Sequence, residues 1–346
     1  MIASKPMRYA VWNNKGGVGK SFLSFILGTE IAHAKPNHKV LLVDMCPQAN
    51  LSEIVLGGNG KGADRLQKML SGDDRKTVGG YFDARIASPH KVTGTEAEYP
   101  LRAKDFNPFM PSNLYLIVGD PSLELQAQVI SQIGGQTLPQ DTWKNVHNWL
   151  KDLVLACIHK LGGEDSVTVL IDCNPSFSAY TELSMMAAER LIIPCSSDGS
   201  SARAIDNVGA LLYGIGGDSK YQSASFKAKA GLFDMALPQI HSVLLNRSTW
   251  YSDKASKAFG AMFNEIKRRT TKLFNADKTR FVFIGKKFWF HEIPDSHSVA
   301  IVCSHLGKPL YQIGPGKVMV HEANVQVNSE PLDRYKKAVA AFLAAL

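Results

Sequence analysis

The chain has 346 residues and little cysteine: five residues, with no C-x-x-C pair. They are Cys46, Cys157, Cys173, Cys195 and Cys303. This odd, scattered set excludes a disulfide scaffold and provides no zinc or iron–sulfur framework, so we expect reduced thiols in a cytoplasmic protein. The sequence also lacks an uncharged apolar run of about 18 residues, and residues 1–8 are too short and polar for a secretory signal. We therefore expect neither a membrane span nor a leader.

Acidic residues are fewer than basic ones, 31 against 39, which gives a net charge of +8. Most of the excess lies in residues 250–290, which contain ten basic and three acidic residues. Such a local basic surface is typical of phosphate-backbone binding, although a solvated helix face has the same composition. The candidate DNA-binding residues are Lys254, Lys257, Lys267, Arg268, Arg269, Lys272, Lys286 and Lys287. Phe259, Phe263 and Phe274 lie among them at a rough helical spacing that favours an inward face over base stacking.

Apolar segments of strand length alternate with amphipathic segments of helix length. Strands are expected at residues 7–12, 39–43, 114–118, 167–172, 191–195, 240–245 and 280–284. Helices are expected at residues 22–34, 123–133, 143–160, 179–188, 201–212, 254–273 and 331–346, with Pro331 in the first turn of the last. This alternation predicts an α/β fold, a doubly wound and mostly parallel sheet with helices on both faces.

No linker or repeat divides the chain, so we expect a single domain over residues 1–346. Two stretches fit the alternation poorly and read as insertions, at about 56–111 and 214–237. The first is rich in Gly, Asp, Lys and Pro and predicts short helices with a long surface excursion. The second is predicted to be irregular.

A glycine-rich loop follows the first expected strand and opens the first helix. It comprises Lys15, Gly16, Gly17, Val18, Gly19, Lys20 and Ser21. Its glycines let backbone N–H groups surround phosphate oxygens, and the helix N-terminus adds its positive dipole end. Lys20 can reach the β- and γ-phosphates, and the Ser21 hydroxyl can bind Mg²⁺.

Two carboxylates follow apolar strands at the sheet edge where α/β proteins bind ligands. Asp172 ends the expected strand 167–172, and a carboxylate there can orient Mg²⁺ through water. Asp44 follows strand 39–43 and is assigned a metal or phosphate-loop role.

The loop departs from the ordinary P-loop because Asn14 stands where the first glycine is usual and a second lysine, Lys15, follows it. This form resembles the deviant Walker A ATPases, specifically the ParA partition family. Three other segments extend the resemblance: residues 40–50 (VLLVDMCPQAN), residues 169–176 (VLIDCNPS), and Ile293-Pro294 followed by residues 307–309.

The resemblance implies a P-loop ATPase fold that binds ATP or ADP with Mg²⁺. It implies catalytic roles for Lys15, Lys20, Asp44 and Cys46, and metal-site roles for Ser21, Asp44 and Asp172. The nucleotide site would comprise residues 15–21 together with Phe22, Asn246 and Arg247, of which Asn246 and Arg247 would contact adenine. Lys15, for which the motif explains no intramolecular partner, would reach across an ATP-sandwich homodimer to the partner's nucleotide.

Cys46 is the departure that matters most. It stands where the resembled family has the second Asp of its Asp-x-Asp-Pro-Gln segment. In that family the resemblance assigns this Asp the positioning of the attacking water. A thiol is a poor hydrogen-bond acceptor, so we hypothesise slow hydrolysis with ATP binding and dimerisation retained. Gln48 or Glu53 could take over the role, or Cys46 could simply pack.

The function implied is a ParA-like ATPase that binds double-stranded DNA non-specifically as an ATP dimer. It would work with a ParB-like adaptor to segregate or position a plasmid, chromosome or other cargo at the nucleoid. Two alternatives stay open: a nucleotide-latched scaffold or signalling switch with little hydrolysis, which Cys46 favours, and a MinD-like membrane-surface ATPase using the tail at 335–343. The tail is rich in alanine and fits closing of the fold better, so a membrane partner is not expected. A nitrogenase-reductase-like enzyme is disfavoured by the cysteine pattern.

Overall fold

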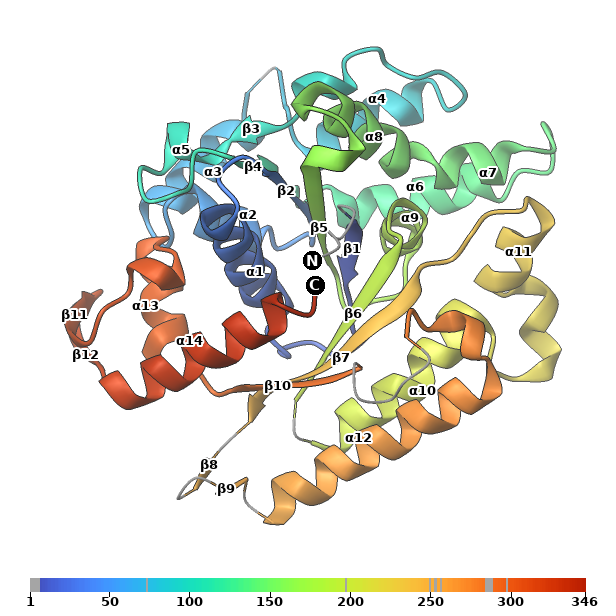
Figure 1. Cartoon of the computed structure of the whole chain (residues 1–346). Coiled ribbons are helices and arrows are strands. Elements are labelled where there is room, and N and C mark those ends of the chain that lie inside the picture. Colours follow the sequence, from blue (N-terminus) through green and yellow to red (C-terminus); the bar gives the residue numbers. More distant parts are fainter. Residues whose placement is uncertain are drawn as a thin grey trace.

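The computed structural model describes residues 7–72, 74–196, 198–248, 250–251, 254–255, 257–283, 289–296 and 298–346. Within these residues, eight strands form one sheet in the order β10-β7-β6-β1-β5-β2-β4-β3. Neighbouring strands are parallel except for β3, which runs antiparallel to β4. This confirms the predicted doubly wound, mostly parallel α/β fold (Figure 1).

The strands are β1 (Arg8–Val11), β2 (Lys39–Met45), β3 (Leu101–Arg102), β4 (Leu114–Ile117), β5 (Val167–Cys173), β6 (Arg190–Cys195), β7 (Gln239–Ser248), β8 (Trp250–Tyr251), β9 (Lys254–Ala255), β10 (Phe290–Pro294), β11 (Gly316–Val320) and β12 (Ala323–Val327). The pairs β8–β9 and β11–β12 form separate antiparallel hairpins.

The α-helices are α1 (Lys20–Ala34), α2 (Asn50–Leu56), α3 (Lys61–Leu70), α4 (Val78–Ala87), α5 (Ala103–Phe106), α6 (Leu123–Gly134), α7 (Thr142–His147), α8 (Trp149–Leu161), α9 (Ala179–Ala187), α10 (Gly199–Tyr213), α11 (Phe226–Leu232), α12 (Lys257–Ala276), α13 (Ser298–Leu306) and α14 (Ser329–Leu343). The 3₁₀ segments are η1 (Glu96–Glu98), η2 (Glu164–Ser166), η3 (Ser219–Ala224), η4 (Lys278–Arg280) and η6 (Leu310–Gln312). Among the described residues, no helix combines the length and apolar character needed to cross a membrane.

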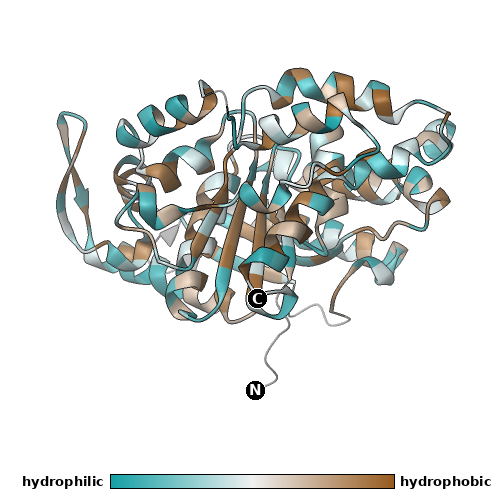
Figure 2. Cartoon of the chain, turned by 90° about the horizontal axis from the view of Figure 1, so that it is seen from above, coloured by the Kyte–Doolittle hydropathy of each residue, from teal (hydrophilic) through white to brown (hydrophobic). Residues whose placement is uncertain are grey.

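The sheet separates two apolar cores because successive strand residues point to opposite faces. Leu41, Val43 and Met45 of β2 face one core, and Val40 and Leu42 face the other. Helices α1, α2, α13 and α14 cover one face, while α4 and α6–α12 cover the other (Figure 1). The central strands are accordingly coloured largely as hydrophobic in Figure 2.

The predicted helix at 143–160 is interrupted at Asn148, which separates α7 from α8. The Asn148 N–H group donates to both the Lys144 and the Asn145 carbonyls, at 3.1 and 3.2 Å. The second of these bonds spans three residues instead of four, as in a 3₁₀ turn, and it marks the end of α7.

The predicted strand at 280–284 is wrong in its described part. Lys278–Arg280 form η4, because the Asp277 carboxylate accepts hydrogen bonds from the Thr279 N–H group and the Arg280 side chain. Phe281 makes only an isolated bridge to Ile240. Ile284 lies outside the described residues.

The basic helix begins later than predicted. It starts at Lys257, and Lys254 belongs to β9, whose backbone pairs with β8 in a short hairpin. The stretch at 214–237 is also more regular than predicted: it contains η3 and α11, and the Ser225 hydroxyl caps α11 by accepting from Ala228 N–H at 3.2 Å.

The stretch at 56–111 forms short helices as predicted, but it is more than a surface excursion. Tyr81 and Phe82 of α4 are fully buried and belong to the core on one side of the sheet. The closing helix α14 has Pro331 in its first turn, as predicted, and buries Leu332, Tyr335, Val339 and Phe342 against the other core.

Candidate functional site

The glycine-rich loop leaves the carboxyl end of β1 and leads into α1. Gly17 and Gly19 have φ values of 76° and 82°, a left-handed conformation that suits glycine. A Cβ added at Gly16 or Gly17 would meet no atom within 4 Å. The inner side of the loop is therefore open to a ligand. Lys20 lies across the loop and donates to the backbone carbonyls of Asn13 and Lys15, at 3.2 and 2.9 Å.

Two buried asparagines tie the loop to neighbouring strands. Asn13 donates through its side-chain amide to Pro194 O in β6, at 2.7 Å, and accepts from Lys15 N–H at 2.9 Å. Asn246 in β7 donates to Val18 O at 2.8 Å. The structure thus places Asn246 behind the loop as a support, and an adenine contact by Asn246 or Arg247 stays a prediction. The Arg247 side chain lies outside what the structure describes.

The loop opens onto a cavity of about 500 Å³. Its lining brings the loop together with the ends of β2 and β5, with α2 and its following turn, and with the end of α13. The lining residues are Gly17, Gly19, Lys20, Ser21, Phe22, Cys46, Gln48, Asn50, Glu53, Ile54, Asn59, Cys173, Asn174, Pro175 and Ser304. Five predicted site residues, Gly17, Gly19, Lys20, Ser21 and Phe22, therefore share one cavity with Cys46.

Asp172 lies fully buried beside this cavity at the end of β5. Neither of its carboxylate oxygens makes a well-formed hydrogen bond in the described structure, although the Ser21 and Ser24 hydroxyls lie close enough to favour its charged form. Burial and the nearby Asp44 carboxylate raise the pKa of Asp172 to about 8, whereas the Ser21 hydroxyl and the Lys20 ammonium act in the opposite direction. A buried, unpartnered carboxylate beside a serine hydroxyl has the oxygen donors that Mg²⁺ prefers, so these residues fit the implied cation.

Asp44 lies opposite Asp172 in the register of β2 and β5. Unlike Asp172, it has several hydrogen-bond partners. Its carboxylate accepts from Ser52 N–H at 2.8 Å, from the Ser52 hydroxyl at 2.7 Å and from Cys46 N–H at 3.1 Å. Burial raises the pKa of Asp44 to about 6, and these hydrogen bonds limit the rise. Asp44 therefore holds the segment between β2 and α2, and its metal role stays a prediction.

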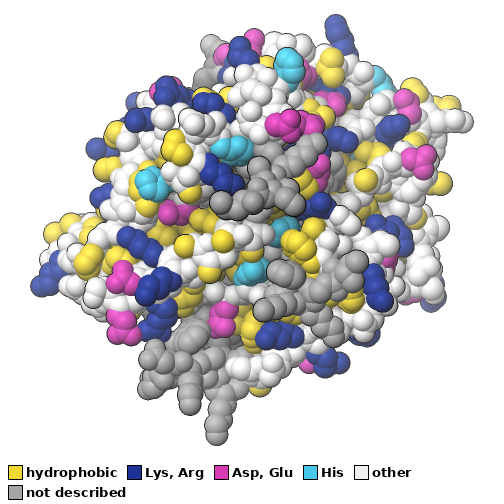
Figure 3. All heavy atoms as spheres, viewed as in Figure 1, with side chains coloured by type: hydrophobic (Ala, Val, Ile, Leu, Met, Phe, Trp, Pro, Cys, Tyr) yellow, Lys and Arg dark blue, Asp and Glu magenta, His cyan; other side chains and the backbone are white. Residues whose placement is uncertain are grey.

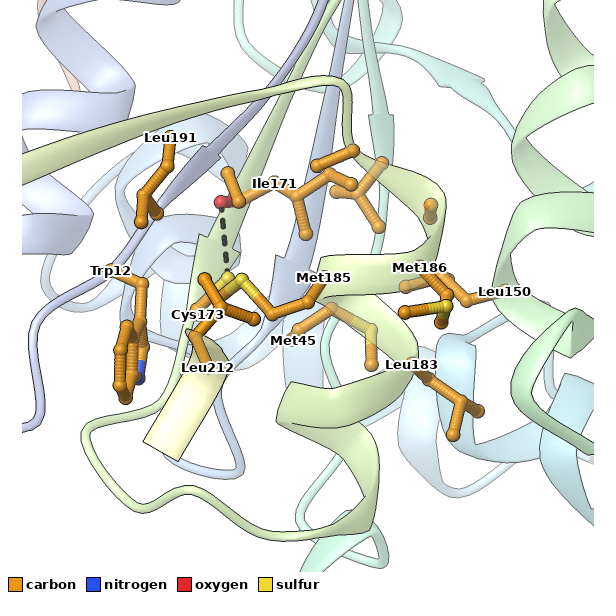
Figure 4. Packing of buried hydrophobic residues seen from close by; sticks show 14 of the residues in the cluster. Trp12, Met45, Leu150, Ile171, Cys173, Leu183, Met185, Met186, Leu191 and Leu212 are labelled. Atoms are coloured by element: carbon orange, nitrogen blue, oxygen red, sulfur yellow. Dashed lines mark hydrogen bonds between the residues drawn. The ribbon is translucent and has the colours of Figure 1, made fainter. Parts of the chain in front are cut away.

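Cys46 forms part of the cavity wall and is 8% exposed. Its thiol faces the Asn174 side-chain oxygen at 3.7 Å. Burial, followed by the Asp44 and Asp172 carboxylates, raises the pKa of Cys46 to about 12. The thiol is neutral near pH 7 and cannot act as a base. Cys173 also borders the cavity, but its side chain packs into the core beside Ile171, Trp12 and Met185 (Figure 4).

Lys15 has intramolecular partners that the loop motif does not explain, and its reach to a second chain stays a prediction. Its ammonium donates to the Ser196 hydroxyl at 3.0 Å and pairs with the Asp198 carboxylate. Asp198 is also the N-cap of α10, where it accepts from Ser200 and Ser201 N–H groups. Lys15 would have to leave this pair to reach a second chain.

Sequence reasoning missed several residues of the site: Asn13, Ser52, Asn174, Ser196 and Asp198. Asn13, Asn174 and Ser196 follow directly, or after one residue, the ends of β1, β5 and β6. Their signal was available, because the carboxyl ends of parallel strands meet at the ligand-binding edge. Ser52 carries no such signal, since it joins Asp44 from a neighbouring helix.

None of the described predicted DNA-binding residues lines this cavity: Lys254 belongs to β9, and the others lie on α12, which packs against α10. Arg268 makes two bonds of 2.7 Å to Glu265, and Arg269 pairs with both Glu265 and Asp206. Lys267 lies 4.1 Å from the centre of the Phe263 ring. Lys272 is exposed. Basic and acidic side chains are interspersed over the face seen in Figure 3.

Four of the predicted DNA contacts cannot be placed as side chains. Lys286 and Lys287 lie outside the described residues, and the side chains of Lys254 and Lys257 are not described. The inward face predicted for the phenylalanines is confirmed for Phe274, which is 6% exposed, and for Phe263, which packs against the same core.

Comparison with known proteins agrees with this geometry. The family profile described as the CobQ/CobB/MinD/ParA nucleotide binding domain matches residues 9–306. A search of curated proteins gives no match. Among solved structures, a Cyanothece McdA–ATP complex has a TM-score of 0.58 at 16% identity, covering 97% of each chain. A Borrelia burgdorferi putative plasmid partition protein bound to AMPPNP has a TM-score of 0.52 at 17% identity, covering 99% of this chain and 100% of its own. At these identities the two structures establish the fold.

Proposed function

Because the chain belongs to the CobQ/CobB/MinD/ParA nucleotide-binding domain family, we propose that it is a ParA-like ATPase that forms an ATP-sandwich homodimer and binds DNA non-specifically. The dimer would position or segregate a plasmid, chromosome or other cargo at the nucleoid, through a ParB-like adaptor. The observation that carries this proposal is the open phosphate loop beside a buried, unpartnered Asp172. Both features suit a ligand that brings phosphate and a cation together.

The residues of this chain have separate tasks in the proposal. The loop N–H groups and Lys20 bind the β- and γ-phosphates, which requires Lys20 to exchange the Asn13 and Lys15 carbonyls for phosphate oxygens. Ser21 and Asp172 would hold Mg²⁺, which supplies charge neutralisation at the phosphates when bound. Lys15 would leave Asp198 and stabilise charge on the partner's nucleotide, as an arginine finger does.

ATP-dependent dimerisation and DNA binding test this proposal together. Sedimentation velocity should detect a dimer with Mg-ATP and a monomer with Mg-ADP, and only the dimer should retain duplex DNA in a filter-binding assay. DNA binding should weaken steeply with added salt. Lys15→Ala should bind ATP but stay monomeric. A wild-type protein that binds ATP and remains a monomer would contradict the proposal.

A nucleotide-latched switch is the second candidate, and Cys46 favours it. Its neutral thiol cannot accept a proton from water. In that case the ATP dimer would persist until a partner released it. A membrane-surface ATPase is less favoured because the apolar face of α14 packs into the core and is not available to a membrane.

A further inference from the structure

The cavity at the phosphate loop contains one acidic residue in its described lining, Glu53. Glu53 lies in the first turn of α2 and is partly exposed. Its carboxylate has no hydrogen-bond or ion-pair partner among the described side chains and backbone groups. An unpaired carboxylate in the same cavity as a phosphate loop repels a bound phosphate and so weakens nucleotide binding. Its presence there suggests a role in the reaction that compensates for the weaker binding.

The backbone around Glu53 is held firmly. The preceding residue, Ser52, makes two hydrogen bonds to the buried Asp44 carboxylate. The Glu53 carbonyl accepts from Gly58 N–H at 2.9 Å. A Cβ at Gly62 would lie 2.1 Å from the same carbonyl, so the next turn packs too closely for any other residue. These contacts fix the start of α2 and keep Glu53 on the cavity wall.

The other groups on the wall are poorer proton acceptors. The Cys46 thiol is neutral, and the amides of Gln48, Asn50 and Asn174 can orient water without taking its proton. Asp44 accepts three hydrogen bonds and lies fully buried behind the wall. Among the described lining residues, Glu53 is therefore the carboxylate that an attacking water can reach.

We propose that Glu53 orients and deprotonates the water that attacks the γ-phosphate of ATP. This inference rests on the proposed ATPase function. The water oxygen forms a bond to the γ-phosphorus, and the bond from that phosphorus to the β–γ bridging oxygen breaks. The bond's electron pair goes to the ADP oxygen. The proton of the water goes to the Glu53 carboxylate and from there to solvent or the released phosphate, which leaves ADP and inorganic phosphate.

Glu53→Gln tests the inference, because it keeps the size of the side chain and removes the base. Single-turnover hydrolysis of Mg-ATP should slow by about 10²–10⁴-fold. The dissociation constant of ATP, measured by titration calorimetry, should stay the same or fall, since a negative charge near the phosphates is gone. Asp64→Asn, on the exposed face of α3, is the matched control and should match the wild type in both assays.

Cys46→Asp in the Glu53→Gln background separates a catalytic role from a structural one. The double variant has a carboxylate on the cavity wall again, so it should hydrolyse ATP at least tenfold faster than Glu53→Gln alone. We do not expect this gain if Glu53→Gln acts by disturbing α2. Hydrolysis by Glu53→Gln at the wild-type rate would overturn the inference and leave the proposed ATPase intact. A wild-type protein that binds ATP without hydrolysing it would overturn both the inference and the proposed turnover.

Discussion

The carboxyl edge of the sheet and the basic surface on α12 both contain charged groups, but they hold them differently. At the edge, Asp172 is buried without a hydrogen-bond partner, and Glu53 faces the cavity without one. On α12, Arg268 and Arg269 are already bonded to Glu265. A carboxyl group that folding buries or confines without a partner indicates a missing ligand, whereas a paired surface charge is satisfied within the chain.

The comparison also shows why a sequence motif is more informative than a charge count. The loop motif fixes backbone shape, residue order and placement at one end of a strand. A count of lysines and arginines cannot show which of them are paired with an acidic residue on another helix, as Arg269 is with Asp206. The following variants test this contrast between the nucleotide site and the basic surface.

Replacing Lys20 should give the largest effect. Lys20→Ala removes the ammonium that spans the loop, and loss of charged hydrogen bonds to phosphate should weaken ATP binding about 100-fold, or about 2.7 kcal/mol. Titration calorimetry measures this. Lys61→Ala, at the exposed start of α3, is the control and should bind ATP as the wild type does. Equal ATP affinities for Lys20→Ala and Lys61→Ala would contradict a phosphate-binding role for the loop.

Asp172→Asn should change both metal-assisted binding and stability. Because the pKa of Asp172 is raised to about 8 in the folded chain, the folded state holds a proton that the unfolded state releases above about pH 4. The free energy of unfolding of the nucleotide-free protein should therefore decrease as pH rises from about 4 to about 8, by at most about 1.4 kcal/mol per pH unit.

Asp172→Asn should flatten that slope and also lower the benefit of Mg²⁺ for ATP binding. Urea unfolding between pH 5 and pH 8 provides the measurement. Asp165→Asn, near the opposite end of β5 and exposed, is the control. An unchanged slope in Asp172→Asn would mean that the carboxylate is not confined in the way the structure indicates.

Glu265→Gln tests the basic surface on α12. It should free Arg268 and Arg269 from their shared carboxylate, so DNA affinity should rise several-fold if this surface contacts DNA. Lys272→Ala should lower affinity for all sequences and reduce the salt slope by about 1. Filter binding over a salt series measures both effects. Unchanged DNA binding in both variants would place the contact elsewhere on the chain.

Asp198→Asn should give the smallest effect. The amide oxygen can still cap α10, but Lys15 loses its ion pair and becomes freer to reach a second chain. Exposed pairs contribute about 0.2–1 kcal/mol, so ATP-dependent dimerisation should strengthen by no more than about fivefold. Sedimentation over a protein concentration series checks this. Weaker dimerisation would show that Asp198 supports the dimer and does not restrain Lys15.

The sequence predicted the parallel sheet and the phosphate loop because both leave local signals: buried apolar strands such as β2 and β5, and glycines at fixed spacing before Lys20. It did not predict β10 or the β11–β12 hairpin, whose segments mix polar and apolar residues, nor α13, whose short apolar run gives no clear helical periodicity. The pairing of Lys15 with Asp198 and of Asp44 with Ser52 was also invisible, because these contacts depend on how separate elements meet in space.

The most direct test of the account is single-turnover hydrolysis of ATP by the wild-type protein, with Mg²⁺ or with a chelator. We expect bound ATP to be converted to ADP and phosphate with Mg²⁺, and conversion to stop without it. We expect duplex DNA to leave the requirement for Mg²⁺ unchanged. Tight ATP binding with no conversion, with or without DNA, would contradict the proposed cycle and identify the protein as a latched switch.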